Sequence, residues 1–410
     1  MQDRQLYAQI LGIVSPWMVE RVELKLTEGQ VHVHLEHDVQ ASWSCAECGQ
    51  PCPMHDHGPE RIWRHLDTCQ FRTLVHAAVP RTHCRTHGVL AVRVPWAEAH
   101  ARFTALFERL AIDWLKVASQ KAVAERLGLS WHEAHGILER AVVRGLKRRQ
   151  AQPIPYIGVD EKAFRKGHRY VTLVTDLTRS CVLFAAEDRK QTSLDGFWPT
   201  LTADQKESIQ GVAMDMWDPY ENSIRANLPG AADKIVYDKF HVAKHLGEAV
   251  DEVRRAESKQ LREEKDDRLV GTRYQWLRHP DNFEDSQWRE FQGLRHSKLK
   301  TARAWALKEQ AMVLWDYHYE TSARKHFAWW YRWASRSRLQ PMMDKAKMLK
   351  GRLANVLTYL KHRITNATSE SLNAKIQWVK YTARGFGNFG NFVTAIYFHC
   401  GNLDLAPSPT

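Results

Sequence analysis

The sequence predicts a multidomain protein that combines the α+β and α/β classes. At 410 residues the chain exceeds the size of one ordinary hydrophobic core. Apolar and polar residues alternate near the N-terminus, as in β-strands, whereas strand and helix patterns follow one another after residue 150. We therefore expect five parts: a β module with clustered cysteines over 1–100, a helix-turn-helix domain over 101–150, the first part of a mixed α/β core over 151–245, an all-helical insertion over 246–360, and the last part of the core over 361–410.

The charge balance favours a polyanionic partner. Lys and Arg total 59 against 47 Asp and Glu, which gives a net charge of +12 and a pI near 9.3. Nucleic acid is the partner that this balance favours, and a merely basic soluble protein is the alternative. The chain has no apolar run of about 18 residues and no basic segment followed by an apolar one at its N-terminus. We therefore expect a cytoplasmic protein with no membrane partner.

The N-terminal region has the period of half-buried strands up to about residue 40, as in Val31-His32-Val33-His34-Leu35. A further strand is expected near 72–79. Between and beside these strands five of the seven cysteines are crowded together, which in a cytosolic chain indicates metal binding rather than disulfides.

The spacing of four of these residues is typical of a zinc site. Cys45 and Cys48 form one pair and Cys84 and His87 a second, each with two residues between the ligands. Four such ligands on two knuckles can close a tetrahedron around Zn²⁺, and a module this small would otherwise lack a core. The alternative is a set of unligated cysteines in a small β module.

A helix-turn-helix follows. A helix over 120–126 leads into Leu127-Gly128-Leu129-Ser130, which supplies a glycine for the turn and an N-cap for a second helix over 131–149. A plain helical hairpin is the alternative, but the position next to a zinc module favours DNA binding. The second helix would then enter the major groove, while its basic end contacts phosphates. That basic end consists of Arg140, Arg144, Lys147, Arg148 and Arg149.

A mixed α/β sheet is expected next, in the order βββαβαβ. From residue 241 to about 361 the pattern is helical and contains seven tryptophans, which are either core residues or, in a minority, platforms for unpaired bases. The expected elements are strands over 156–159, 170–175 and 181–186, a helix over 193–201, a strand over 209–214, a helix over 220–227, and a strand over 234–237.

Two aspartates follow apolar strands of this sheet. Asp160 comes after strand 156–159, and Asp215 comes after Val212-Ala213-Met214. Because strand ends in an open α/β sheet form the edge where ligands bind, the two carboxylates can converge on one cation. Hard divalent ions such as Mg²⁺ prefer such oxygen ligands. Taken singly, an aspartate at a strand end can simply begin a turn, and Asp218 is a rival for the place of Asp215.

A third carboxylate is expected from a later helix. Glu370 shares one helical stripe with Asn366, Asn373 and Gln377, while apolar residues occupy another stripe. Two metal ions held by three carboxylates can activate an attacking water or 3′-hydroxyl and stabilise the leaving oxygen. A lone glutamate on a helix is otherwise usually solvated.

Several motifs together resemble bacterial insertion-sequence transposases of the DDE class, particularly the zinc-finger-bearing ISL-three (ISL3) family. The resemblance covers nearly the whole chain. It is carried by Gly158-Val159-Asp160-Glu161, Met214-Asp215-Met216-Trp217 with Pro219-Tyr220, Tyr237-Asp238-Lys239-Phe240-His241-Val242, Thr365-Asn366-Ala367 through Glu370 with Asn373-Ala374-Lys375-Ile376, and Gly385-Phe386-Gly387-Asn388-Phe389 with Asn391-Phe392.

The resemblance implies an RNase H-like catalytic core in which Asp160, Asp215 and Glu370 are the ligands of Mg²⁺ or Mn²⁺. His241, in an Asp-x-x-His motif with Asp238, would contact the scissile phosphate or order the site; the alternative is a buried histidine satisfied by hydrogen bonds. The second zinc pair is usually two cysteines in the family, so His87 is a departure that leaves Cys52, Cys69 or His83 as alternatives.

The resemblance also implies the activity and the partners. The protein would bind the terminal inverted repeats of its element, cleave DNA and join the ends to target DNA, as a homodimer or larger synaptic complex. A zinc-containing helix-turn-helix regulator without catalysis is one rival, and an RNase H-like nuclease that cuts without strand transfer is another.

Overall fold

The computed structural model describes residues 3–165 and 169–407, without the side chains of residues 367, 368 and 370. The chain divides into two compact units. No helix among the described residues is long and apolar enough to cross a membrane. The N-terminal unit comprises Met1–Arg149, Val379–Arg384 and Gly390–Thr410, and the central unit comprises Gln150–Trp378 and Gly385–Phe389.

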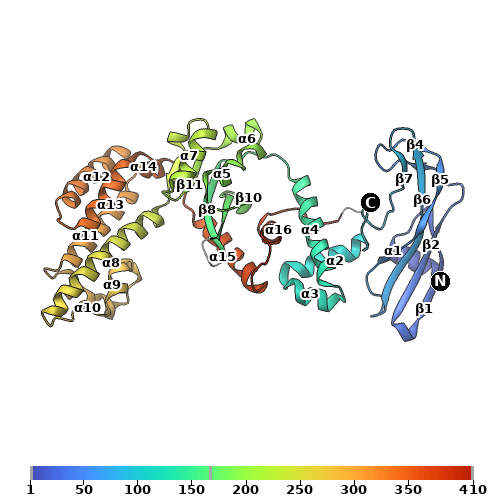
Figure 1. Cartoon of the computed structure of the whole chain (residues 1–410), viewed down its shortest axis with the longest axis horizontal. Coiled ribbons are helices and arrows are strands. Elements are labelled where there is room, and N and C mark those ends of the chain that lie inside the picture. The colour runs from blue at the N-terminus through green and yellow to red at the C-terminus, as the bar shows by residue number, and fades with distance from the viewer. Residues whose placement is uncertain (1–2, 166–168, 408–410) are drawn as a thin grey trace. The chain divides into compact units, whose positions relative to one another are not determined.

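A five-stranded sheet forms the first part of the N-terminal unit, in the order β1-β2-β6-β5 with β7 paired to β6 (Figure 1, blue). Val31, Val33 and Val75 alternate with polar residues and enter the core beneath the fully buried Trp63. A separate pair of short strands carries the first cysteine knuckle. The strands are β1 (Trp17–Lys25), β2 (Gln30–His37), β3 (Trp43–Ser44), β4 (Pro51–Cys52), β5 (Met54–Arg64), β6 (Arg72–Cys84) and β7 (Gly88–Ala91).

The expectation of strands from residue 1 onward was wrong for the first segment. Residues Asp3–Leu11 form helix α1, which packs against β1. Tyr7, Ala8 and Leu11 have helical spacing and contact the core of the sheet, so the apolar period here is that of a helix.

Three helices follow the sheet in the N-terminal unit, as the turn chemistry predicts. Gly128 ends the second helix with a φ of 64°, and Ser130 starts the third with a reciprocal capping box to Glu133. Phe398 and Leu405, from the C-terminal part of the same unit, pack into the core of these helices. The helices are α2 (Ala105–Val117), α3 (Gln120–Leu127) and α4 (Trp131–Arg148).

The central unit contains the predicted mixed sheet, in the order β10-β9-β8-β11-β12. Strands β8, β9 and β10 are antiparallel neighbours, whereas β11 runs parallel to both β8 and β12. The helix expected over 193–201 is shorter, because the chain turns into a 3₁₀ segment with Pro199. The elements are β8 (Tyr156–Arg165), β9 (Arg169–Asp176), β10 (Cys181–Glu187), α5 (Gln191–Asp195), α6 (Ala203–Ser208), β11 (Gly211–Met214), α7 (Asp218–Asn227) and β12 (Ile235–Tyr237).

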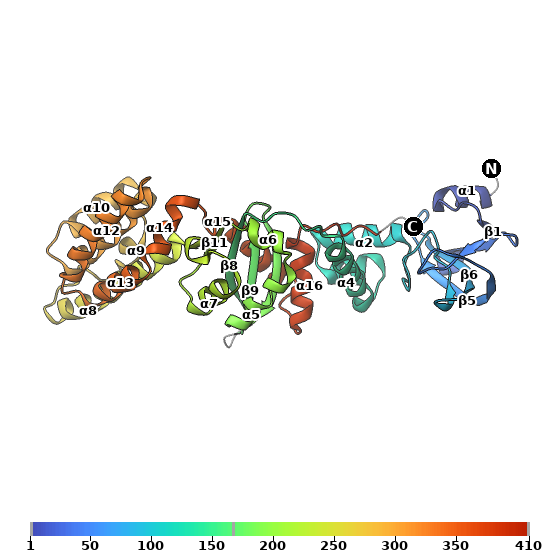
Figure 2. The ribbon, with the colours of Figure 1, turned by 90° about the horizontal axis from the view of Figure 1, so that it is seen from above.

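A helical region follows β12 in the central unit, drawn in yellow to orange in Figures 1 and 2. Its tryptophans are mostly core residues, since Trp276, Trp305, Trp315 and Trp330 are all buried, whereas Trp329 is half exposed. The helices are α8 (Lys239–Glu263), α9 (Arg273–Leu277), α10 (Asp285–Arg295), α11 (Lys300–Met312), α12 (Glu320–Ser335), α13 (Gln340–Gly351) and α14 (Leu353–His362). Helix α15 (Ala367–Thr382) belongs to the central unit up to Trp378, whereas α16 (Phe389–Cys400) belongs to the N-terminal unit from Gly390 onward.

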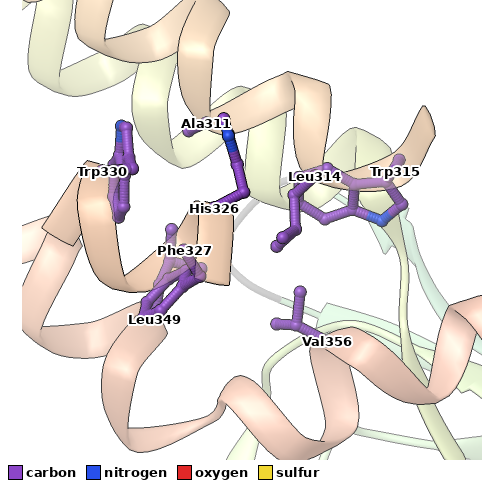
Figure 3. Close-up of a pocket in the computed structure, with 8 residues that line it drawn as sticks. All are labelled: Ala311, Leu314, Trp315, His326, Phe327, Trp330, Leu349 and Val356. Atoms are coloured by element: carbon purple, nitrogen blue, oxygen red, sulfur yellow. The ribbon is translucent and has the colours of Figure 1, made fainter. Parts of the chain in front are cut away.

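A small apolar cavity lies between these helices, with Trp315, Phe327 and Leu349 among the side chains around it (Figure 3). Its volume of about 10 Å³ is room for no more than one water molecule. The cavity is therefore a packing gap of the helical core rather than a binding site.

Candidate active site and metal-binding residues

Asp160 and Asp215 lie at the same level of two neighbouring parallel strands. Strand β11 ends at Met214, so Asp215 follows its end as expected. Asp160 does not end its strand, because β8 continues to Arg165 through its pairing with β9. On the other side of β8, the pairing with β11 stops at Gly158 and Ala213. Continuing that register places Asp160 level with Asp215, just past the end of β11.

Helix α15 lies against β8 on the side of Asp160. A Cβ atom at Gly158 would come within 2.7 Å of Ser369 Oγ and 2.8 Å of Asn366 Oδ1, so only glycine allows the helix to approach this closely. Asn373 Nδ2 donates a hydrogen bond of 2.6 Å to Asp160 Oδ2. Lys162 Nζ lies 3.4 Å from the same oxygen. The helix expected to carry the third carboxylate is thus packed on the strand that carries the first.

The side chain of Glu370 lies outside the described residues. Among side chains that are described, groups of three or more His, Cys, Asp or Glu donors close enough to share an ion occur at two places, both in the N-terminal unit. Asp160 and Asp215 belong to neither group.

His241 is brought to Asp215. It lies in the first turn of α8, which begins after β12, and its Nε2 is 2.6 Å from Asp215 Oδ1. The contact is not aligned as a hydrogen bond, and this buried oxygen has no hydrogen-bond partner. Burial lowers the pKa of His241, but the contact with Asp215 and the charges of Asp238 and Asp160 outweigh burial and raise the pKa overall. Asp238 itself caps α8 by accepting from Phe240 N–H at 3.1 Å.

Glu161 is a further acidic residue of this site that the sequence reasoning did not single out. Burial and repulsion from Asp215 raise the pKa of its carboxyl, an effect opposed by Arg189, whose Nη1 is 3.2 Å away. The Arg189 guanidinium lies between the rings of Tyr170 and Trp217. The only sequence signal for Glu161 was its position next to Asp160.

Asp218, the rival of Asp215, is engaged elsewhere. It begins α7, it is paired with Arg352, and its side chain is 69% exposed. This arrangement favours Asp215 for the site.

The four expected zinc ligands come together in the N-terminal unit. Their donor atoms all lie within 4.8 Å of one another. Cys48 Sγ is 3.8 Å from Cys84 Sγ, and His87 Nδ1 is 3.6 Å from the Sγ atoms of both Cys45 and Cys84. A tetrahedron with Zn–S bonds of about 2.3 Å has edges of roughly 3.8 Å, so the donor set fits the ion.

Backbone N–H groups favour the thiolate form of two of these cysteines. Those of His87 and Thr86 lower the pKa of Cys84 to about 6, and those of Cys48 and Glu47 lower the pKa of Cys45. The other expected candidates, Cys52, Cys69 and His83, are not part of the four-residue cluster.

The basic end of α4 is largely occupied by internal partners. Arg144 is 8% exposed and donates to Glu98, Glu108 and the Leu405 carbonyl. Arg140 also pairs with Glu108. The remaining members are Arg148, which donates to Asp404 and the Ala406 carbonyl, Arg149, which donates to the Gly401 carbonyl, and Lys147, which is exposed.

Family models match three successive parts of the chain. A model described as a transposase matches residues 157–396, and one described as the helix-turn-helix domain of transposase family ISL3 matches residues 92–142. A third, described as a zinc-finger of transposase IS204/IS1001/IS1096/IS1165, matches residues 41–87.

Two curated relatives are similar over nearly their whole length. The transposase for insertion sequence element IS1001 from Bordetella parapertussis is 29% identical over 392 residues, which is 94% of this chain and 95% of the relative. The transposase for insertion sequence element IS1557 from Mycobacterium tuberculosis is 26% identical over 416 residues, covering 94% of this chain and 93% of the relative. Because the transposase model also spans more than half of the chain, the chain belongs to the ISL3 family of insertion-sequence transposases.

Proposed function

We propose that this transposase cleaves and joins DNA at a divalent-metal site formed by Asp160, Asp215 and Glu370 in the central unit. The observation that carries the proposal is the alignment of Asp160 with Asp215 on neighbouring parallel strands, with α15 packed on the first of them. The buried Oδ1 of Asp215, which lies 2.6 Å from the cationic form of the His241 ring, fits a group that carries negative charge into the site, and carboxylate oxygens are the ligands that hard divalent ions prefer.

Glu370 is proposed from its described neighbours. Asn366 precedes it by four residues and Asn373 follows it by three, and both belong to the side of the segment that contacts β8. Residues at these spacings share one face of a helix. We also propose an RNase H-like core over 151–245 with the helices of 246–360 as its insertion. The last part of this core, expected over 361–410, is shorter than expected, because residues 379–384 and 390–410 belong to the N-terminal unit.

The chain's own residues position the reaction. Asn373 and Lys162 hold the Asp160 carboxylate, and His241, which lies against Asp215, would contact a scissile phosphate. Bound Mg²⁺ or Mn²⁺ would activate the attacking oxygen and stabilise the leaving one. A water would first attack the phosphorus and break its bond to the 3′-oxygen, which leaves a 3′-hydroxyl and a 5′-phosphate. This hydroxyl would then attack a phosphorus of target DNA, forming a new P–O bond and displacing the 3′-oxygen of the target strand.

The zinc ligands proposed for the N-terminal unit are Cys45, Cys48, Cys84 and His87. Next to them, α3 and α4 would bind the terminal inverted repeats, with Lys147 as the exposed basic residue for phosphate contact. Arg144 is not proposed to contact phosphate, because its guanidinium is paired with two carboxylates inside the unit. Because two DNA ends must be handled together, the working form would be a homodimer or larger synaptic complex.

The test separates binding from chemistry. We expect Asp160→Asn, Asp215→Asn and Glu370→Gln each to lower Mg²⁺-dependent cleavage of end DNA by at least about 10³-fold, because each removes a metal-ligand charge. Binding of end DNA in a gel-shift assay should stay unchanged. The matched control is Asp218→Asn, which removes a nearby carboxylate that faces Arg352 instead.

Three outcomes count against the proposal. Undiminished cleavage in any of the three variants would remove that residue from the site. A wild-type protein that shifts end DNA but never nicks it would be a regulator. Cleavage without joining of the 3′ end to target DNA would indicate a nuclease.

A further inference from the structure

The N-terminal sheet carries a second cluster of metal-binding side chains, apart from the four residues assigned to zinc. In β2 and β6 the residues that alternate with the core valines include His32, His34 and His76. His34 and His76 are direct partners in the parallel pairing of the two strands. Their rings stack with centroids 4.4 Å apart. The period of the strands therefore places three imidazoles on the face of the sheet that does not form the core.

Glu60 on β5 completes this cluster. Its Oε2 is 3.4 Å from His76 Nδ1 and its Oε1 is 3.7 Å from His34 Nδ1. One donor atom from each of the three residues lies within 4.8 Å of the others. Two imidazoles and a carboxylate form a common ligand set for catalytic and open zinc sites.

A chain of polar contacts orients His76 toward Glu60. Gln30 Oε1 lies 2.9 Å from His32 Nε2, and His32 Nδ1 lies 2.9 Å from His76 Nε2. His76 Nδ1 in turn lies 3.4 Å from Glu60 Oε2, to which its N–H can donate. A metal ion at this site would take the place of that proton between the imidazole and the carboxylate. Histidines that bind a metal through one ring nitrogen usually form a hydrogen bond through the other, as His76 Nε2 can with His32.

We propose that His34, His76 and Glu60 bind a divalent transition-metal ion, with Zn²⁺ as the ion of choice, at a site separate from the cysteine cluster. His32 and Gln30 orient His76 from behind. The ion would link β2, β5 and β6 across the polar face of the sheet, where the described hydrophobic core does not reach.

Besides Glu60, the charged residues in contact with His34 include Arg21 and Glu23. Arg21 Nη2 lies 3.2 Å from His34 Nδ1, while the same guanidinium binds Glu23 at 2.8 Å. Glu23 Oε1 is also 3.8 Å from His34 Nε2. An ion bound at His34 would displace Arg21 from this ring, and Arg21 would keep its ion pairs with Glu23 and with Glu20, whose Oε2 is 3.4 Å from Arg21 Nη1. Removing the arginine should therefore tighten metal binding.

The experiment counts metal equivalents on the full-length protein. After equilibration with zinc in excess Mg²⁺, which occupies the carboxylate site proposed for the central unit, and removal of free metal, zinc analysis should give about two equivalents per chain for the wild type and about one for Glu60→Gln and for His34→Gln. Glu60 is more than half exposed, so its replacement leaves the fold intact, which near-ultraviolet circular dichroism of the buried tryptophans would verify. His55→Gln, an exposed histidine on the same strand as Glu60, is the matched control and should retain two equivalents.

Cobalt identifies which site is filled. In Cys48→Ser the remaining Co²⁺ equivalent should lack thiolate charge-transfer absorption, whereas in Glu60→Gln the remaining one should keep it. Arg21→Gln should lower the dissociation constant of the second equivalent roughly tenfold. A wild-type protein that binds one equivalent, or a second equivalent that persists in Glu60→Gln or His34→Gln, overturns the proposal and leaves a proton between His76 and Glu60 as the occupant.

Discussion

Individual contacts decide how the candidate active site is held. Asp160 is fixed by an amide from α15, and Asp215 by an imidazole from α8, so that two helices distant in sequence each hold one carboxylate. The contact that brings α15 close enough depends on a single missing side chain, at Gly158. Position 158 therefore controls the geometry of the site without supplying any chemical group.

Gly158→Ala should disable the site. Its Cβ atom would lie 2.7 to 2.8 Å from polar atoms of Ser369, Asn366 and Thr175, so α15 must move away from β8. We expect a loss of about 1–3 kcal/mol in the free energy of unfolding and at least about a tenfold loss of cleavage rate, with end binding retained. Gly293→Ala in α10, where a Cβ atom meets nothing within 4 Å, is the control and should leave cleavage unchanged. Normal cleavage in Gly158→Ala would show that α15 need not approach so closely.

His65 should make the N-terminal unit sensitive to acid. Burial, with a smaller contribution from the charge of Arg64, lowers the pKa of His65 to about 4, and its Nδ1 lies 2.9 Å from Thr104 Oγ1. Between pH 6.5 and about 4 the unfolded chain binds a proton that the folded chain does not, so stability falls as the pH falls through this window. The loss from this residue is on the order of 3 kcal/mol.

Urea unfolding from pH 7 to pH 4 would measure this effect, with tryptophan fluorescence as the signal. The difference in unfolding midpoint between wild type and His65→Gln should shrink or reverse as the pH falls, because the variant has no group to protonate. His132→Gln, an exposed histidine on α4, should follow the wild type. A constant difference between wild type and His65→Gln across this range would refute the prediction.

At the scale of elements, the sequence predicted what local period and turn chemistry determine. The strands of the central sheet and the capped helices α3 and α4 followed from alternation and from Gly128 and Ser130. Helix α1 was not predicted, because the apolar residues of so short a segment fit the helical period and the strand period equally well. Only its packing against the sheet distinguishes the two. The true length of β8 depends on pairing with β9, which no local pattern reveals.

The candidate sites, too, were predictable only where their residues are close together in the sequence. Cys45, Cys48, Cys84 and His87 lie in two local pairs, so their spacing already indicated how they would meet. Arg144 was misjudged because its partners Glu98 and Leu405 are remote in sequence. The cluster of His34, His76 and Glu60 could not be predicted either, because it depends on which strands are neighbours in the sheet.

The cap of α4 should affect DNA binding through the stability of the helix. Ser130 Oγ accepts from Glu133 N–H at 3.2 Å, and Glu133 Oε2 accepts from Ser130 N–H at 2.8 Å. Ser130→Ala should cost about 1 kcal/mol in the free energy of unfolding and weaken binding of end DNA. Ser130→Thr keeps the hydroxyl and should behave like the wild type. Equal thermal midpoints for the alanine and threonine variants would contradict this role of the cap.

At the scale of the whole molecule, the chain folds into two compact units, and the candidate sites in the two units differ in chemistry. The thiolate cluster, the helix-turn-helix and the imidazole cluster belong to the N-terminal unit, whereas Asp160 and Asp215 belong to the central unit. Because each unit has its own hydrophobic core, damage to one should leave the chemistry of the other in place. Metal loss from the N-terminal unit is the direct way to examine that independence.

Cys84→Ser should uncouple DNA-end recognition from catalysis. Losing one thiolate ligand should empty the cysteine site and unfold its knuckles, since small zinc modules fold on their metal. We expect binding of end DNA to weaken by at least about tenfold, while Mg²⁺-dependent nicking of plasmid DNA without element ends stays within about twofold of wild type. Cys52→Ser is the matched control, because Cys52 lies on β4 beside the cluster but outside its four residues. If Cys52→Ser lost zinc as Cys84→Ser does, the ligand set would need revision, and if nicking fell together with end binding, the two units would not function independently.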